Sequence, residues 1–184
     1  MAFTESSMLP LGTLAPSFTL PDTVSGKNIN LQDIQSDKAN LIMFICNHCP
    51  YVIHVEKELA RLAKDYQAKG VNVVAISSND VERYPADSPD KMTDYAAKNE
   101  FTFPYLYDES QAVAKAYDAA CTPDFYVFDG EMRLAYRGRL DDSRPNSDTP
   151  LTGKDLRAAL DAVLAGETVS EVQYPSGGCG IKWK

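Results

Sequence analysis

The sequence predicts an α/β fold with a central mixed β-sheet flanked by helices. An apolar run over residues 41–45 is followed at once by a helical pattern, and a second apolar run covers 71–77. Two buried strands joined by a helix form a βαβ unit, which is right-handed by default. Further along, residues 125–137 contain two strand patterns around an Asp-Gly turn, which indicates a hairpin that closes the sheet.

The bulk composition favours one globular domain over residues 1–184. Hydrophobic residues make up 44% of the chain and charged residues 24%, which is ordinary for a folded protein. A net charge of -8 argues against a nucleic-acid surface. No apolar segment approaches the roughly 20 residues that cross a bilayer, so we expect no membrane contact. The first dozen residues do not resemble a secretion signal, so we expect a cytoplasmic protein whose thiols are reduced at rest.

The remaining elements follow in order from local patterns. The chain starts with a loose lead-in of about a dozen residues. Two short strands and a helical turn then precede the central strand, and the main helix ends near Gly70. The last part is a Gly-rich tail over 174–184, which we expect to be mobile. The expected elements are strands at 17–20, 27–31, 71–77, 103–107, 125–128 and 133–137, a helical turn at 31–34, and helices at 90–99, 111–117 and from 152 to about 166.

Two cysteines stand where the first buried strand leads into the main helix. The motif is Cys46-Asn47-His48-Cys49, followed by Pro50 in the first helical turn. The helix N-terminus stabilises an anion and lowers a cysteine pKa from about 8.5 into the range of about 3.5–7.5. Two intervening residues let the sulfurs meet, so the pair suits cycling between dithiol and disulfide. Half of a metal site and inert packing are the alternatives, and the chain has no second CxxC.

A second candidate segment is Cys121-Thr122-Pro123, just before the strand at 125–128. A proline there cannot donate to the sheet, so it belongs at the strand's start or edge. One hypothesis is a cis Thr122–Pro123 bond that faces the two cysteines and leaves the backbone of Thr122 free to bind an extended peptide. The alternative is an ordinary trans turn proline.

Together these features resemble the thioredoxin-fold family. The resemblance rests on CxxC after a buried strand, Thr-Pro before a hairpin, and a final helix, and it covers the chain from about Leu14 onward. Within this family, the N-terminal hairpin and the insertion between 77 and 103 make the chain more similar to the alkyl-hydroperoxide-reductase/thiol-specific-antioxidant (redoxin) branch than to other branches. The stretches FICNHCPYV, CTPDFYVFD, YRGRLDDSRP and GCGIKWK resemble a bacterial thioredoxin family protein subgroup.

The resemblance implies roles for five residues. Cys46 corresponds to the exposed nucleophile that attacks a substrate disulfide, and Cys49 to the resolving cysteine. His48 occupies a position where oxidising members carry a histidine that favours a thiolate; a loop histidine is the alternative. Thr122 and a cis Pro123 would hold the partner. The family needs no organic cofactor or metal. Its implied partners are thiol or disulfide substrates and a thioredoxin or glutathione system as reductant.

Two departures from the family pattern leave questions open. Thioredoxin-like reductants carry a buried carboxylate six residues before the first cysteine, and Asn40 stands there. Asp80, Glu82 and Asp108 are the candidates to handle the proton of Cys49. Thiol peroxidases carry a Thr three residues before the reactive cysteine. Met43 precedes Cys46 at that spacing, and Cys46 itself precedes Cys49.

Two other functions remain as alternatives to disulfide exchange. A peroxiredoxin-like thiol peroxidase with an antioxidant role would form a sulfenic acid on one cysteine and condense it with the other. A metal-binding or redox-sensing module would use Cys46, His48, Cys49 and Cys179 without turnover. Cys121 is expected to be a packed small residue, and Cys179 either a further resolving thiol, a metal ligand or an unengaged tail residue.

Overall fold

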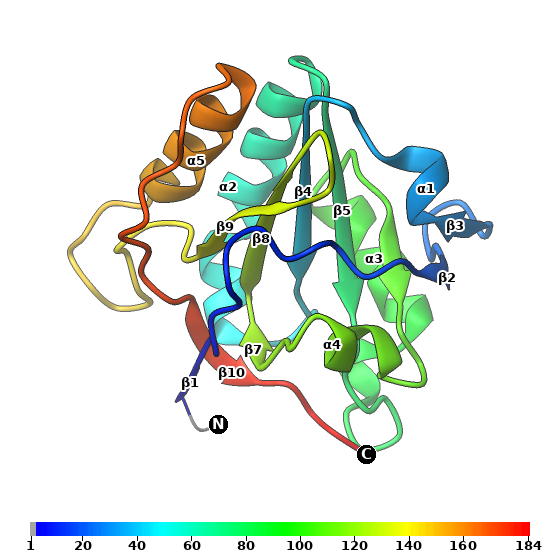
Figure 1. Cartoon of the computed structure of the whole chain (residues 1–184). Helices are drawn as coiled ribbons and strands as arrows, with labels where there is room; N and C mark the ends of the chain where they lie inside the picture. Colours follow the sequence, from blue (N-terminus) through cyan, green and yellow to red (C-terminus); the bar gives the residue numbers. More distant parts are fainter. Residues whose placement is uncertain (1–2) are drawn as a thin grey trace.

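The computed structural model describes residues 3–184 and is built around a five-stranded mixed sheet (Figure 1). The strand order is β6-β5-β4-β8-β9, in which β4, β5 and β6 are parallel and β8 and β9 are antiparallel to their neighbours. This confirms the expected α/β class and closing hairpin. The strands are β4 (Ala39–Phe44), β5 (Val71–Ser77), β6 (Tyr105–Tyr107), β8 (Asp124–Asp129) and β9 (Leu134–Gly138).

The central strand β4 is buried along its whole length because both faces of the sheet are covered. Its side chains alternate between two cores. Leu41 and Met43 face the core formed with the long helices, whereas Ile42 and Phe44 face the core on the other side. The uninterrupted apolar run in the sequence is therefore explained by burial on two faces.

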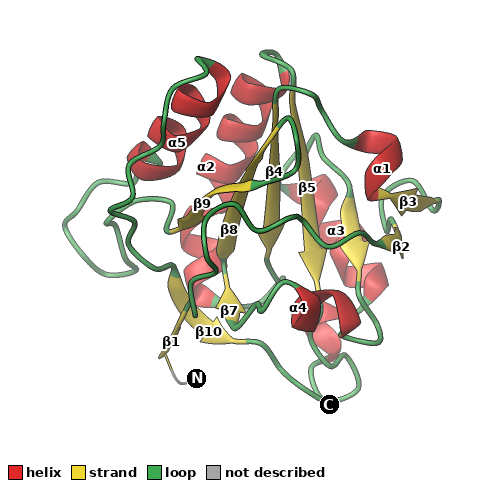
Figure 2. Ribbon diagram, in the orientation of Figure 1, coloured by secondary structure: helices red, strands yellow, loops and turns green. Residues whose placement is uncertain are grey.

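Helices cover the two faces of the sheet unequally (Figure 2). One face carries α2 (Pro50–Gln67), α3 (Pro89–Lys98) and α5 (Lys154–Leu164), and the other carries α1 (Leu31–Ile34), α4 (Ala112–Ala116) and the N-terminal segment. The hairpin β2 (Thr19–Pro21) and β3 (Asn28–Asn30) forms a separate antiparallel pair. Within residues 3–184, no helix combines the length and apolarity needed to cross a membrane.

A small second sheet corrects two expectations about the chain ends. Its order is β1-β10-β7, formed by Phe3–Glu5, Gly177–Gly180 and Cys121–Thr122. The lead-in is therefore not loose where residues 3–5 pair, and the Gly-rich tail is a central strand with Gly178 and Cys179 buried. The sequence did not predict β10 because three of its four residues are glycine, so the segment has no hydrophobic periodicity. Figure 1 shows β10 crossing below the N-terminal end of α2.

A buried ion pair joins β8 to β9 behind the small sheet. The Nη2 of Arg137 lies 2.9 Å from the Oδ2 of Asp124, and both side chains are fully buried. Burial raises the pKa of Asp124 to about 6 and outweighs the opposing effect of the Arg137 charge. The Arg137 guanidinium also lies 4.5 Å from the ring centroid of Tyr126. The pair fixes the strand that begins directly after Thr122 and Pro123.

Replacing Arg137 by Ala is expected to lower the free energy of unfolding by about 3–5 kcal/mol, because the Asp124 carboxylate is left buried without a partner. The loss of unfolding free energy in Arg137→Ala should be smaller at acidic pH, because a protonated Asp124 no longer leaves a buried charge without a partner. Urea denaturation at two pH values measures both effects. Lys154→Ala is the control, since it breaks an exposed pair with Asp142 and should cost less than about 1 kcal/mol. Equal losses in the two variants would contradict a structural role for the buried pair.

Candidate active site

The CxxC turn connects the end of β4 to the start of α2. Cys46 follows the strand, Cys49 is the N-cap residue of the helix, and Pro50 occupies the first turn. The backbone N–H groups of His48 and Cys49 favour the thiolate form of Cys46. These N–H groups would otherwise lack partners at a helix N-terminus. The turn therefore offers Cys46 an anion-stabilising cradle, as the sequence pattern predicts.

The disulfide in the structure joins Cys49 to Cys179, with their Cα atoms 6.3 Å apart, and Cys46 and Cys121 are free. The expected pairing of Cys46 with Cys49 is therefore not the one observed. The reason lies in the small sheet, where Cys179 is paired with Thr122 and so lies beside the helix N-terminus. The sequence left open whether Cys179 folds back onto the site or stays unengaged in the tail, and in the structure Cys179 folds back and is bonded to Cys49.

Thr122 is the point on which the CxxC sulfurs converge. The Sγ of Cys46 lies 3.5 Å from the Thr122 hydroxyl, and the Sγ of Cys49 lies 3.6 Å from the Thr122 carbonyl oxygen. The peptide bond between Thr122 and Pro123 is cis. The backbone of Thr122 is not free for a partner, because Cys179 of β10 pairs with it. The chain's own tail thus occupies the edge at which we expected an extended peptide.

Cys46 is buried rather than exposed, with 1% of its surface accessible. Burial raises the pKa of Cys46 to about 11, and the nearby charge of Asp87 acts in the same direction. The hydroxyl of Thr122 and the two backbone N–H groups oppose this shift without cancelling it. The expectation of a water-accessible, acidified nucleophile is therefore wrong for this conformation. Desolvation outweighs the helix N-terminus here.

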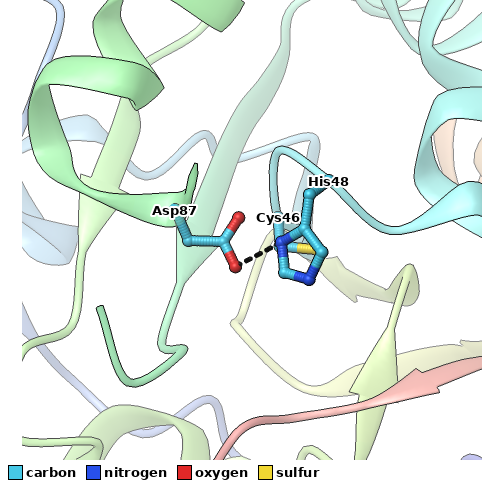
Figure 3. Close-up of side chains that lie close together, drawn as sticks. All are labelled: Cys46, His48 and Asp87. Carbon is cyan, nitrogen blue, oxygen red and sulfur yellow. Dashed lines mark ion pairs between the residues drawn. The ribbon is translucent and has the colours of Figure 1, made fainter. Parts of the chain in front are cut away.

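His48 and Asp87 form the polar side of the site (Figure 3). The Nδ1 of His48 lies 2.7 Å from the Oδ2 of Asp87, whose side chain is fully buried. The Nε2 of His48 has no hydrogen-bond partner among the described residues. The imidazole stacks on the ring of Tyr84, with centroids 5.8 Å apart and an interplanar angle of 6°. His48 is therefore oriented by a carboxylate and an aromatic ring while one ring nitrogen stays available.

Asp87 is the functional candidate that the sequence did not reveal. It lies in the 3₁₀ turn η1 (Pro85–Asp87), inside the insertion between 77 and 103. Its Oδ1 accepts from the backbone N–H of Asn47 at 2.8 Å, and its Oδ2 accepts from Nδ2 of Asn79 at 2.9 Å. Asn47 also donates to the carbonyl of Ala86 at 3.1 Å. The CxxC dipeptide is thus tied to η1 by contacts across about 40 residues of sequence.

The other three carboxylates suggested by the sequence have different positions. Asp80 lies 3.4 Å from the Nε of Arg83, and Asp108 accepts from Ser78 and from the N–H of Ala114 at the start of α4. Glu82 lies on the same loop as Asp80, and its backbone N–H donates to the Oδ1 of Asp80 at 3.1 Å. Asp87 is the carboxylate whose charge acts on Cys46. Among the described residues, none of the three candidate carboxylates forms a hydrogen bond with Cys49, whose proton handling stays a question from the sequence.

A metal ion would find three donors here. The Sγ of Cys46, a ring nitrogen of His48 and a carboxylate oxygen of Asp87 all lie within 4.8 Å of one another. Thiolate, imidazole and carboxylate are ligands that zinc accepts. However, both Asp87 oxygens and the Nδ1 of His48 are already engaged within the protein. Cys49 and Cys179 are joined to each other, so the four-residue ligand set considered from the sequence is not assembled.

Cys121 and His54 lie outside this cluster. The Sγ of Cys121 lies 3.8 Å from the carbonyl oxygens of Pro123 and Ser176, and the residue is fully buried, which agrees with a packed small side chain. The Nε2 of His54 contacts the hydroxyl of Ser143 at 2.9 Å. His54 lines a cleft that also includes Pro123 and Gly177. This cleft borders the site on the side of β10.

Two sequence relatives of the chain are named as peroxiredoxins. The chain is 28% identical over 116 residues to a putative peroxiredoxin of Mycobacterium tuberculosis, covering 63% of this chain and 68% of that protein. It is 26% identical over 130 residues to peroxiredoxin Bcp of Escherichia coli, covering 70% and 78%. Peroxiredoxin is the name given to those two proteins, and the sequence identity does not by itself show their activity for this chain.

Solved structures extend the likeness to the full length. An uncharacterized conserved protein from Geobacillus kaustophilus matches with a TM-score of 0.98 and 59% identity, covering 100% of this chain and 97% of that one. A hypothetical protein from Sinorhizobium meliloti matches with a TM-score of 0.96 and 46% identity, covering 98% of both chains. A secreted disulfide oxidoreductase of Mycobacterium tuberculosis shares the fold, with a TM-score of 0.60 and 17% identity over 79% of this chain and 95% of that one. The AhpC/TSA family model matches residues 11–137, and the chain belongs to the AhpC/TSA family.

Proposed function

We propose that this protein is a thiol–disulfide oxidoreductase that works through the CxxC pair at the N-terminus of α2. One observation carries the proposal: three cysteines meet at this helix end, two of them joined as a disulfide and the third free. A free thiol beside a disulfide has the components of an exchange reaction. Membership in a redoxin family supports the same chemistry.

In this proposal Cys46 attacks the substrate disulfide and Cys49 resolves the mixed disulfide. The thiolate of Cys46 forms a bond to one substrate sulfur and expels the other as a thiolate. The thiolate of Cys49 then attacks the Cys46 sulfur and expels the first substrate sulfur, so the substrate is reduced by two electrons. Thr122 supports both steps, since the two sulfurs lie 3.5 and 3.6 Å from its side-chain and backbone oxygens.

The proton of Cys46 has a route through His48. A ring nitrogen of His48 and the Sγ of Cys46 lie within 4.8 Å of each other, and the Oδ2 of Asp87 lies 2.7 Å from the Nδ1 of His48. Transfer of the proton from sulfur to imidazole creates a thiolate–imidazolium pair, which the buried Asp87 carboxylate counterbalances. His48 therefore serves as the base, and Asp87 is a positioning residue that acts through it.

Proposed partners follow from this chemistry. The substrate is a disulfide or thiol on a protein or a small molecule, and the electrons come from a thioredoxin or glutathione system. No organic cofactor takes part in exchange between sulfur atoms. The cytoplasmic location stays a prediction that goes with such a reducing environment.

A thiol peroxidase is the second candidate function. It is favoured by the AhpC/TSA match and by the curated relatives, which are named as peroxiredoxins. In this version a peroxide oxidises a thiolate to a sulfenic acid and releases an alcohol or water, and condensation with a second thiol gives the disulfide and water. Cys49 and Cys179 are placed to be such a pair.

Removing either CxxC sulfur should abolish exchange. Cys46→Ser and Cys49→Ser are each expected to lower the rate of glutathione-disulfide reduction by at least about 100-fold, because each loses one of the two sulfur transfers. Cys121→Ala removes a buried cysteine outside the cluster and should keep the native rate. The measurement is thiol release under single-turnover conditions with pre-reduced protein. Native rates in both CxxC variants would contradict the proposal.

The same proteins decide between exchange and peroxide reduction. Stopped-flow oxidation with hydrogen peroxide should proceed at the rate of an ordinary free thiol if exchange is the function. A rate far above that level, lost in Cys49→Ser and retained in Cys46→Ser, would assign the peroxidase function instead.

The high pKa of Cys46 predicts a steep pH dependence in the oxidised protein. With a pKa of about 11 rather than 9, its thiolate fraction at pH 8 is about 100-fold lower, and it should rise about tenfold per pH unit. Asp87→Asn removes a negative charge and should lower the pKa of Cys46, while leaving it above 9 because burial is the larger cause. Thiolate absorbance in a Cys121→Ala background measures this. An unchanged titration in Asp87→Asn would contradict the assigned effect of the carboxylate.

A further inference from the structure

The C-terminal strand β10 is built into the active site rather than attached beside it. It pairs antiparallel with β1 on one side and with β7 on the other, and Cys179 is aligned with Phe3 and with Thr122. Cys179 is 3% exposed, so its disulfide to Cys49 is enclosed by protein. No external protein can reach Cys49 while this strand is in place.

Gly178 allows the strand to approach this closely. A Cβ atom at this position would collide with the carbonyl oxygen of Thr122 and lie 3.2 Å from the Cβ of Tyr51 in α2. A Cβ at Gly180, in the same strand, would lie 3.1 Å from the Thr4 hydroxyl, with its other neighbours at ordinary contact distances of 3.9 Å and more. Gly177 is also closely packed, against the ring of Phe3, but Gly178 is the glycine of β10 whose Cβ would collide with the backbone of β7, and this close approach holds Cys179 against the N-terminus of α2.

The segment after β10 connects to the polar side of the site. The N–H of Lys182 donates to Oδ1 of Asn79 at 2.9 Å, and Nδ2 of Asn79 donates to Oδ2 of Asp87 at 2.9 Å. Gln111 accepts from the N–H of Lys184 at 3.1 Å and donates to the carbonyl of Lys182 at 2.9 Å. The tail is therefore hydrogen-bonded to the same Asn79 that holds the carboxylate beside His48.

From this arrangement we propose that Cys179 is a third redox cysteine, and that β10 is an internal disulfide partner which occupies the place of an external one. The proposal rests on the function proposed above for Cys46 and Cys49. After Cys46 and Cys49 have formed a disulfide, the Cys179 thiolate attacks the Cys49 sulfur. A Cys49–Cys179 bond forms, the Cys46–Cys49 bond breaks, and Cys46 leaves as a thiolate that takes up a proton.

This transfer consumes no external oxidant or reductant, since one disulfide and one thiol are exchanged for another disulfide and thiol. Its driving force is the docking of β10: the ladder to β1 and β7 and the Asn79 and Gln111 contacts accompany the Cys49–Cys179 bond. The observed structure is then the end state of the relay, with Cys46 reset as a buried, protonated thiol. The reverse transfer, in which Cys46 attacks Cys49, releases β10 and opens the site.

A trapping experiment on the full-length chain tests the relay. Pre-reduced protein is mixed with excess glutathione disulfide, samples are acid-quenched over time, and peptide mapping quantifies both intramolecular disulfides. We expect Cys46–Cys49 to appear first and to convert into Cys49–Cys179 at a rate independent of protein and oxidant concentration. The final ratio should favour Cys49–Cys179 by at least about tenfold. The fluorescence of Trp183, the only tryptophan and part of the tail, should change with the second step.

Two variant pairs sharpen the test. Cys179→Ser should stop at Cys46–Cys49, whereas Cys121→Ala should complete the conversion. Gly178→Ala keeps every cysteine and should shift the final ratio toward Cys46–Cys49, with a smaller shift in Gly180→Ala.

The results separate the relay from the underlying function. Appearance of Cys49–Cys179 with no earlier Cys46–Cys49, or persistence of Cys46–Cys49 at equilibrium in the native protein, would overturn the relay while glutathione disulfide is still reduced. Failure of the native protein to reduce glutathione disulfide at all would instead overturn the proposed exchange function.

Discussion

The contact between β10 and the N-terminal end of α2 is the constraint on which the rest of the site depends. It brings a cysteine from the last residues of the chain to one that follows the central strand, 130 positions earlier in the sequence. The same contact pairs Cys179 with Thr122, whose hydroxyl lies 3.5 Å from the Sγ of the buried Cys46. Burial then sets the chemistry, because it raises the pKa of Cys46 against the effect of the backbone N–H groups around it. The described conformation is therefore a closed state.

The positions that sequence patterns predicted are those fixed by local periodicity. The strand over 39–44 and the helix over 50–67 follow from an apolar run and a helical stripe, and both were expected within three residues. Cys46 and Cys49 lie close to Thr122, as expected from the hypothesis that the Thr122–Pro123 segment faces the CxxC pair. The N-cap position of Cys49 follows directly from the strand-to-helix transition.

The missed features all depend on long-range contacts. Asp87 stands in a short 3₁₀ turn with no distinctive pattern, and only the fold brings it to Asn47 and His48. β10 contains little besides glycine, so its place between two strands had no hydrophobic signal. Four cysteines allow several pairings, and the one observed is decided by strand register rather than by spacing. The acidified Cys46 was inferred from the helix end and its exposure from the family resemblance, and neither of these reveals the burial of its side chain in the fold.

The resulting site combines a redoxin framework with an internal partner strand. Its most direct measurement is a redox equilibrium of the intact protein against glutathione, with acid trapping and peptide mapping at each potential. A single two-electron transition that links Cys49 to Cys179, and that is absent when Cys49 is replaced by Ser, is the expected result. If Cys49 and Cys179 stay as free thiols across the whole range in which glutathione buffers, or if their bond never reopens, these cysteines form no redox centre and the proposed chemistry is wrong.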